Sequence, residues 1–586
     1  MEEGANMAAD MKPEAKYWTY DAMWEQLRLW ERQYPDFITV EVAGKSRQGR
    51  DLALCVLTDR RRGSSESKPG SFVDANIHAG EVTGNAVAMY WMGQVLASSS
   101  DPDSEGARLL ADHTLYVIPR IAVDGAEAYL TTPMRLRSSP HLYPEAEPRS
   151  GFVPDDVNGD GLILTIRQES PEGGFKVDPE DPRVMVPRDP DDTADRGPFY
   201  HLYPEGRVDR RHMAGSRPVG PDTRPTRRMG QDFNRNFPIR WAGEDGQPGA
   251  GPYPLSEPET RVIAESILAH RNIATYVALH TAGGVILRQP SVGDDTKLGL
   301  EDLGYYRRAG EMGERRSGYF CRSNWAAFAS GFEKTVLMPG AADDWVYETQ
   351  GILGFTLEIW DLARHAGARG YAEFGRRHLM ELSAAERALD QRKILAWAER
   401  TVGPEAFHAW TPFDHPDLGP VEIGGLEPKF LVQNPPPALL AEECARVASF
   451  LSGLALSTPR LVVGGYVVEA LSERTYRIAV ETVNAGFLPT SATAHGRTLG
   501  QVDPVRARLE GARVLAGTSP AVLGHLKGFG DAGEGSGAAQ AAVAEWVVEG
   551  APDTVVTVTF YGERAGQAVV HLPLRPAERG RIAGSP

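Results

Sequence analysis

The sequence has 586 residues, 41% hydrophobic and 24% charged, which is the composition of a globular protein long enough for a large domain and a smaller one. Its formal net charge of -17 argues against a nucleic-acid partner, because phosphate backbones are bound by clustered Lys and Arg. We find no apolar run long enough to span a bilayer, and the first residues lack the basic and then apolar pattern of a secretory signal. We therefore expect no membrane partner, a cytoplasmic location if the chain is full length, and a secreted one if a leader has been trimmed.

The first two thirds of the chain alternate between helical and strand patterns. Apolar side chains at helical spacing predict a helix near residues 17–32, and two alternating segments joined by a turn predict a hairpin over residues 37–59. The segment SFVDANIHAGE predicts a strand that runs into a loop before a helix. The apolar segments TLYVIPRIA, ATYVALH and GFTLEIW predict buried strands. We expect an α/β domain with a mostly parallel mixed sheet flanked by helices.

A long polar segment interrupts this domain, and a second domain follows it. Residues 138–230 are rich in Pro, Asp, Gly and Arg and show little helical or strand periodicity, which predicts a long polar insertion. After a helical segment near residues 370–400 and a last packing helix, LLAEECARVASFLSGLAL, the pattern changes to short alternating strands. We place the larger domain at residues 1–456 and a smaller β-sandwich domain at residues 457–586.

Four residues at or near predicted strand ends form a candidate metal centre. His78 and Glu81 lie three residues apart where a strand leads into a helix, His280 ends ATYVALH, and Glu358 lies within GFTLEIW. Because ligands gather at the carboxyl ends of the strands of an open α/β sheet, we expect the four side chains to meet. Imidazoles and carboxylates are the ligands of zinc hydrolases, and a buried carboxylate is costly unless it is paired or bound to a metal. The three cysteines lie far apart without C-x-x-C spacing, so a cysteine zinc site is not indicated.

In these motifs and their order, from about Tyr17 to Leu456, the chain resembles the zinc carboxypeptidases of the carboxypeptidase A-like family. It looks like a bacterial-type member with a long insertion and a C-terminal β-domain. GKSRQGRDL is similar to the family's strand-turn-strand entry, and NIHAGE is similar to its H-x-x-E ligand motif. The resemblance implies one zinc ion per chain, held by His78, Glu81 and His280, and a general base at Glu358.

Further motifs of the family imply how a substrate is bound. VDGAEAY stands where the family usually has Asn-Pro-Asp-Gly, and counting on from it places Arg137, with Arg135 as the alternative, where the family has the arginine that polarises the substrate carbonyl. DFNRNFP is similar to the family's Asn-Arg pair, which gives Asn234 and Arg235 the role of binding the substrate carboxylate. A guanidinium can bind a carboxylate bidentately, so this pair would select a free chain end.

Two positions concern the terminal residue of the substrate. Counting back from Asp344 and Trp345 places Val336 where many members have a mobile tyrosine that caps the bound chain end, so we expect that end to be bound differently here. Asp343 falls near the position where basic-preferring members have an acid. This resemblance implies a preference for Lys or Arg at the substrate terminus, and the alternative is a plain loop aspartate.

The insertion contains a pattern typical of calcium loops. In DDVNGDG, Asp156, Asn158 and Asp160 supply alternating oxygens and Gly161 supplies a turn. Arg167 occupies the twelfth position in place of a bidentate Glu, which excludes a complete EF-hand. A structural calcium site and a plain Asx turn both stay open. From the length of the insertion, we expect it to rim the cleft and to restrict the size of the substrate.

Three functions are compatible with these residues. The first is a zinc metallocarboxypeptidase that hydrolyses the C-terminal bond of a peptide or a peptide-like substrate with a free carboxylate. The second is a zinc amidase or peptidase of another kind, such as a peptidoglycan peptidase or a deacylase. The third is a binding protein without catalysis, against which the presence of all three ligands and of Glu358 argues.

Overall fold

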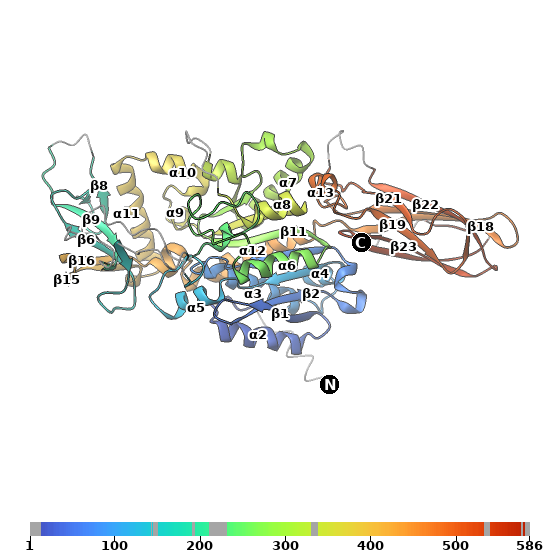
Figure 1. Ribbon diagram of the computed structural model, residues 1–586, viewed down its shortest axis with the longest axis horizontal. Helices are drawn as coiled ribbons and strands as arrows, with labels where there is room; N and C mark the ends of the chain where they lie inside the picture. The colour runs from blue at the N-terminus through green and yellow to red at the C-terminus, as the bar shows by residue number, and fades with distance from the viewer. Residues whose placement is uncertain are drawn as a thin grey trace.

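The centre of the molecule is an eight-stranded mixed sheet in the order β1-β2-β4-β3-β11-β14-β12-β13 (Figure 1). The computed structural model describes residues 13–141, 143, 151–189, 194–209, 231–329, 338–531, 539–575 and 578–580. The strands are Ile38–Lys45 (β1), Asp51–Leu57 (β2), Gly70–Ala75 (β3), Thr114–Ile118 (β4), Ile273–Thr281 (β11), Val285–Arg288 (β12), Phe320–Ser323 (β13) and Leu353–Ile359 (β14). The central strands β4, β3, β11 and β14 are parallel. β1 is antiparallel to β2 and β2 to β4, while β12 is antiparallel to β14 and parallel to β13. The predicted mixed sheet is confirmed.

Helices cover both faces of this sheet, because successive strand residues point to opposite faces and both sets are apolar. Val277 and Leu357 pack on one face, and Phe72 and Tyr276 pack on the other. The first face is covered by α2 (Tyr20–Gln33), α3 (Val82–Ala97), α4 (Glu105–Asp112), α7 (Leu300–Ser317) and α12 (Pro437–Ala455), and the second by α5 (Val123–Thr131), α6 (Pro258–Ala269) and α8 (Ala342–Gln350). None of the helices in the described part of the chain is long and apolar enough to cross a bilayer.

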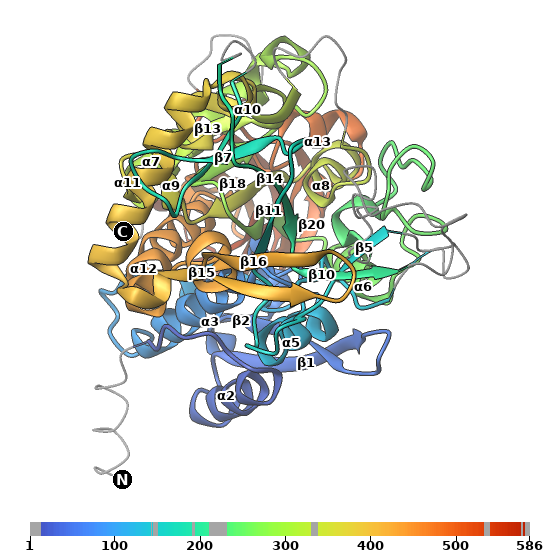
Figure 2. The ribbon, with the colours of Figure 1, turned by 90° about the vertical axis from the view of Figure 1, so that its left-hand side faces the viewer.

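The insertion contains regular strands, which corrects the expectation of a segment with little strand character. Its strands are Gly151–Pro154 (β5), Thr165–Glu169 (β6), Phe175–Val177 (β7), Met185–Pro187 (β8), Phe199–Pro204 (β9) and Gly206–Asp209 (β10). Four of them join β15 (Phe407–His415) and β16 (Gly419–Leu426) in a sheet of order β15-β16-β6-β9-β7-β8, which faces the viewer in Figure 2. These strands are too short for a clear alternation, and Arg167 of β6 pairs with Glu422 of β16, 255 residues further on.

Three helices connect the last strand of the central sheet to β15. They are α9 (Leu362–His365), α10 (Tyr371–Glu381) and α11 (Ala384–Thr401), and the last two lie in the segment near residues 370–400 that the sequence predicts to be helical. Leu395 of α11 packs with Val186 of β8 in a small apolar cluster. We call the sheet of β15, β16, β6, β9, β7 and β8 the insertion sheet. It is therefore attached to the rest of the molecule through α11 as well as through its own strands β15 and β16.

The C-terminal part of the chain is rich in β-strands, as predicted. One sheet consists of β20 (Arg513–Ala516), β22 (Ala541–Glu549), β18 (Thr475–Asn484), β17 (Leu461–Ala470) and β25 (Glu578–Gly580), and the other of β21 (Ala521–Gly524), β19 (Val505–Glu510), β23 (Val555–Gly562) and β24 (Gly566–Pro573). Both sheets contribute to one apolar core, in which Ile478 and Trp546 meet Val558 and Phe560. A short helix, α13 (Ala494–Leu499), contacts α7 and α8 of the central domain (Figure 1).

Candidate metal centre and active site

Parallel pairing of three central strands brings the candidate residues to one edge of the sheet. His280 of β11 is the direct neighbour of Glu358 of β14, and β3, on the other side of β11, leads into the loop that carries His78 and Glu81. His280 and Glu358 share the face of the sheet that α8 covers, because their neighbours Leu279 and Leu357 pack on the opposite face. The sheet therefore brings together all four residues that the sequence singles out.

The loop after β3 turns sharply because Asn76 adopts a left-handed backbone conformation with a φ of 58°. The Asn76 side-chain amide donates to the carbonyl of His78 at 2.6 Å, which braces the turn. Glu81 then forms the N-cap of α3. The loop thus aims His78 and Glu81 at one point, and Asn76 is a structural residue that the motif comparison does not identify.

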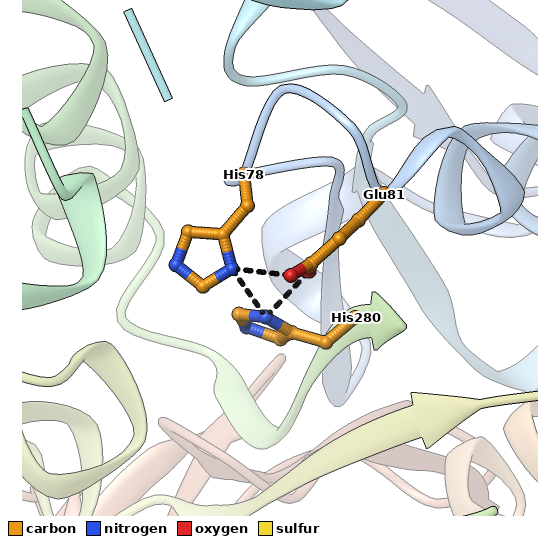
Figure 3. Close-up of side chains that lie close together, drawn as sticks. All are labelled: His78, Glu81 and His280. Atoms are coloured by element: carbon orange, nitrogen blue, oxygen red, sulfur yellow. Dashed lines mark hydrogen bonds and ion pairs between the residues drawn. The ribbon is translucent and has the colours of Figure 1, made fainter. Parts of the chain in front are cut away.

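His78, Glu81 and His280 form a compact buried cluster (Figure 3). His78 Nδ1 lies 2.7 Å from Glu81 Oε1, His280 Nδ1 lies 2.9 Å from Glu81 Oε2, and the two Nδ1 atoms are 3.2 Å apart. Burial alone would raise the pKa of Glu81, but the adjacent imidazoles lower it, so the carboxylate is charged.

This donor set fits a zinc ion. Two imidazole nitrogens and one carboxylate are a known ligand set of catalytic zinc, which leaves a fourth position open. One potential ligand atom from each residue lies within 4.8 Å of the others, and the three side chains converge from two separate elements. A cation at this point would accept the nitrogen lone pairs and balance the carboxylate charge, and buried charges are stable only when they are paired or bound to a metal.

Asp232 supports the cluster from outside, although the sequence analysis does not single it out. Asp232 Oδ1 lies 3.2 Å from His78 Nε2, the ring nitrogen turned away from the cluster, and Oδ2 accepts from Arg137 Nε at 2.9 Å. Burial would raise the pKa of Asp232, but the guanidinium groups of Arg137 and Arg235 lower it well below its ordinary value. A carboxylate on the second nitrogen of a metal-ligating histidine fixes the ring and its tautomer. Its position two residues before the Asn-Arg pair, as the first residue of DFNRNFP, was the available signal.

A cavity of about 140 Å³ opens beside the cluster. His78, His280, Arg137, Asn234, Arg235 and Glu358 all line it, together with Asp343 and Asp344. Burial, followed by the negative charge of Glu81, raises the pKa of Glu358 to about 7. A carboxylate in this environment can hold a proton near neutral pH, which suits an acid-base role. Arg135, the alternative to Arg137, is not among the lining residues.

Arg235 and Asn234 are held at the wall of this cavity by the turn Phe233–Arg235. Asn234 Oδ1 accepts from the backbone N–H of Ala342 at 2.8 Å, which connects the turn to the start of α8. Arg235 Nη1 donates to the carbonyl of Asn234 at 2.7 Å, and none of the described residues forms a salt bridge with its guanidinium. The guanidinium is therefore free to bind an anion in the cavity.

The first turn of α8 contributes two buried carboxylates to the cavity. Asp343 Oδ2 accepts from Asn324 Nδ2 at 2.8 Å, and burial together with the charge of Asp344 raises the pKa of Asp343 to about 6. Asp344 accepts from Gln289 Nε2 at 2.6 Å and pairs with Arg240. Asp343 thus differs from Asp344 in having no cationic partner among the described residues.

The calcium-like loop is satisfied internally. Asp156 accepts from the backbone N–H groups of Gly159, Asp160 and Gly161, and Asn158 Oδ1 accepts from Asp160 N. This is the hydrogen-bond pattern of an Asx turn, and calcium binding at this loop stays a prediction. Val336, the position of the missing tyrosine, lies outside the described residues.

A family model described as "Zinc carboxypeptidase" matches residues 23–144 and 204–373, and a model described as a domain of unknown function matches residues 460–572. Carboxypeptidase B2 of Bos taurus is 28% identical over 145 residues, which are 23% of this chain and 34% of the relative. Zinc carboxypeptidase A 1 of Drosophila melanogaster is 31% identical over 112 residues, 19% of this chain and 25% of the relative. The chain thus matches about a third or less of the length of these relatives.

Two solved structures align with more than half of this chain. The crystal structure of thrombin activatable fibrinolysis inhibitor (TAFI) has 17% sequence identity and a TM-score of 0.39, and the match covers 69% of this chain and 81% of that chain. Murein-tripeptide amidase MpaA of Escherichia coli O157 has 12% identity and a TM-score of 0.23, with 62% and 90% of the two chains covered.

Proposed function

The chain belongs to the zinc carboxypeptidase family, and on this premise we propose that it is a zinc-dependent metallocarboxypeptidase that releases the C-terminal residue of a peptide. The observation that carries the proposal is one cavity lined by both histidines of the metal-type cluster, by the half-buried Glu358 and by Arg235, which has no salt bridge among the described residues. His78, Glu81 and His280 would hold the zinc ion. Bound zinc supplies Lewis-acid chemistry that polarises the scissile carbonyl.

The residues of the chain perform the remaining steps. Arg235 binds the terminal carboxylate, and Asn234 adds a directional hydrogen bond, so the bond next to the chain end is the one presented to Glu358. Glu358 takes a proton from the attacking water and delivers it to the leaving amine. Arg137, whose Nε is held by Asp232, offers its remaining N–H groups to the oxyanion that develops on the carbonyl.

Asp343 supports a preference for Lys or Arg at the substrate terminus. It lines the cavity, is buried, and among the described residues its side chain hydrogen-bonds only to the amide of Asn324, so a substrate cation could pair with it. Replacing Asp343 by Asn is expected to lower kcat/KM for Lys- and Arg-terminated peptides while leaving that for apolar termini nearly unchanged.

The proposal is tested by measuring the hydrolysis of N-blocked dipeptides that differ in the C-terminal residue, each with and without a zinc chelator. Glu358→Gln should lower kcat by about 100-fold or more, because a general base contributes that factor, and should still bind zinc. Glu422→Gln, on β16 of the insertion sheet, is the matched control and should retain activity. Release that survives the chelator, or full activity of Glu358→Gln, would refute the mechanism.

The alternative, a zinc amidase such as a peptidoglycan peptidase or deacylase, is distinguished in the same assay. A carboxypeptidase loses its substrate when the terminal carboxylate is converted to an amide, since Arg235 then has no anion to bind. An amidase of this kind would release no terminal residue from any N-blocked dipeptide with a free carboxylate. It would instead cleave the amide bond of another carboxylate-bearing substrate in a chelator-sensitive reaction.

A further inference from the structure

The end of α8 that lies away from the active-site cavity is held by the C-terminal β-rich domain, defined here as residues 461–580. The first turn of helix α8 carries Asp343 and Asp344 at the cavity. The helix ends at Gln350, where Gly351 forms the C-cap with a φ of 61°. The last carbonyls of a helix have no partners within it and need donors from elsewhere. The contacts of these carbonyls decide how firmly the helix is positioned.

The C-terminal domain supplies those donors. Arg564, in the turn between β23 and β24, donates from Nη2 to the carbonyl of Gln350 at 2.7 Å and from Nη1 to that of Gly351 at 3.0 Å. Thr493 Oγ1 donates to the same Gly351 carbonyl at 2.8 Å, and His495 Nε2 donates to the carbonyl of Glu348 at 2.9 Å. A buried guanidinium at a helix C-terminus also complements the helix dipole.

The backbone at the end of α8 and the backbone of α13 lie too close together for a side chain to fit between them. A Cβ atom added to Gly351 would lie 2.2 Å from Cα of Gly496 in α13, so the C-cap of α8 and the helix α13 are in direct backbone contact. Asp302 of α7 completes the junction, because its carboxylate accepts from Tyr347 Oη of α8 and from the backbone N–H groups of Ala494 and His495. The end of α8 is therefore enclosed by polar side chains, of which Arg564, Thr493 and Asp302 are buried.

The opposite end of α8 shapes the substrate pocket. Its first backbone N–H, from Ala342, is bound by Asn234, and its first turn presents Asp343 and Asp344 to the cavity. An α-helix of nine residues is a short rigid rod about 13 Å long. A shift at Gly351 therefore moves Asp343 relative to Arg235 and Glu358.

We propose that the C-terminal β-rich domain positions the specificity helix α8, with Arg564 as its main positioning residue. The inference rests on the proposed function, because it concerns the pocket for the terminal residue of the substrate. It assigns a role to a domain in which the sequence shows no chemical motif: Arg564 acts on the substrate through α8 and touches neither the substrate nor the metal ligands.

Three variants test this inference in the full-length protein. Arg564→Met removes the donors, Arg564→Lys keeps the charge, and Thr493→Val removes only one hydroxyl donor and is the variant least at risk of failing to fold. Arg477→Met is the matched control, because Arg477 lies exposed on β18 of the same domain and pairs with Glu545. Thermal unfolding of each variant separates local from global effects.

Hydrogen exchange of the peptide covering residues 342–351 is the first readout, and it needs no catalysis. We expect Arg564→Met to exchange about tenfold faster there, with Arg564→Lys and Thr493→Val intermediate and Arg477→Met unchanged. The second readout is kinetic: KM for Lys-terminated dipeptides should rise about tenfold, equivalent to about 1.4 kcal/mol, while kcat changes less than about twofold.

The outcomes are distinguishable. Unchanged exchange at residues 342–351 in both Arg564→Met and Thr493→Val would overturn the inference, as would equal effects in Arg477→Met. Faster exchange with unaltered KM and unaltered terminal preference would overturn the link to specificity. A wild-type protein that neither cleaves nor binds any dipeptide would refute the proposed function and with it that link, while exchange alone would still decide whether the domain holds α8.

Discussion

Replacing Asp232 tests whether the metal cluster depends on a residue outside it. Asp232→Ala removes the acceptor at 3.2 Å from His78 Nε2 and the ion pair with Arg137, whereas Asp232→Asn keeps an oxygen acceptor without its charge. Loss of an outer partner of a ligating histidine lowers metal affinity by about 10- to 100-fold, which corresponds to about 1.4 to 2.8 kcal/mol. We expect Asp232→Asn near the lower value and Asp232→Ala near the upper one.

Zinc affinity measured by competition with a chromophoric chelator at fixed pH is the assay. Asp59→Asn serves as the control, since Asp59 is another aspartate paired with an arginine, Arg61, but follows β2 and is not part of the metal cluster. Circular dichroism checks that each variant is folded. If Asp232→Ala bound zinc within about twofold of the wild type, or if Asp59→Asn lost as much affinity, the assigned role of Asp232 would be wrong.

Three further predictions concern stability. Added zinc should raise the unfolding temperature of the wild type, because the ion binds the folded chain, and His280→Gln should abolish most of this increase in a thermal scan with and without the metal. Burial raises the pKa of Glu259 to about 7 from 4.5, so the folded chain keeps a proton that the unfolded chain releases, and stability falls as pH rises between these values. Between about pH 4.5 and about pH 8, the free energy of unfolding of Glu259→Gln should therefore rise by up to about 3 kcal/mol relative to that of the wild type. Urea titrations measure this difference, and a pH-independent difference would contradict the prediction. Gly84→Ala should destabilise by about 1 to 3 kcal/mol, since its Cβ would lie 2.7 Å from the Leu279 carbonyl, whereas Gly304→Ala, in open space on α7, should be neutral or stabilising.

The arrangement of the candidate site follows in large part from local sequence patterns. His280 ends an apolar run, and Glu358 interrupts another, so each could be placed near the carboxyl edge of a buried strand before the register was known. What the patterns could not provide is that the two residues are direct neighbours across β11 and β14. Pairing register depends on the packing of both faces of the sheet.

Residues that act through loop geometry were beyond the sequence patterns. Asp232 is the first residue of the motif DFNRNFP, yet its contact with His78 depends on how this turn, 154 residues away in the sequence, folds over the cluster. Asn76 has no signature beyond its left-handed conformation, which is visible only in the structure. Arg564 resembles any other turn arginine until its two carbonyl partners on α8 are known.

The insertion sheet has a consequence for the order in which the chain can fold during synthesis. Strand β6 pairs on one side with β9, which follows within the same insertion, but on the other side with β16, which is made only after the whole central sheet. Until then β6 presents an open edge, and such edges invite pairing with other chains. This sheet can therefore close only after the last strand of the central sheet has been made, because β6 must wait for the hairpin β15–β16, and such non-local pairing is slow.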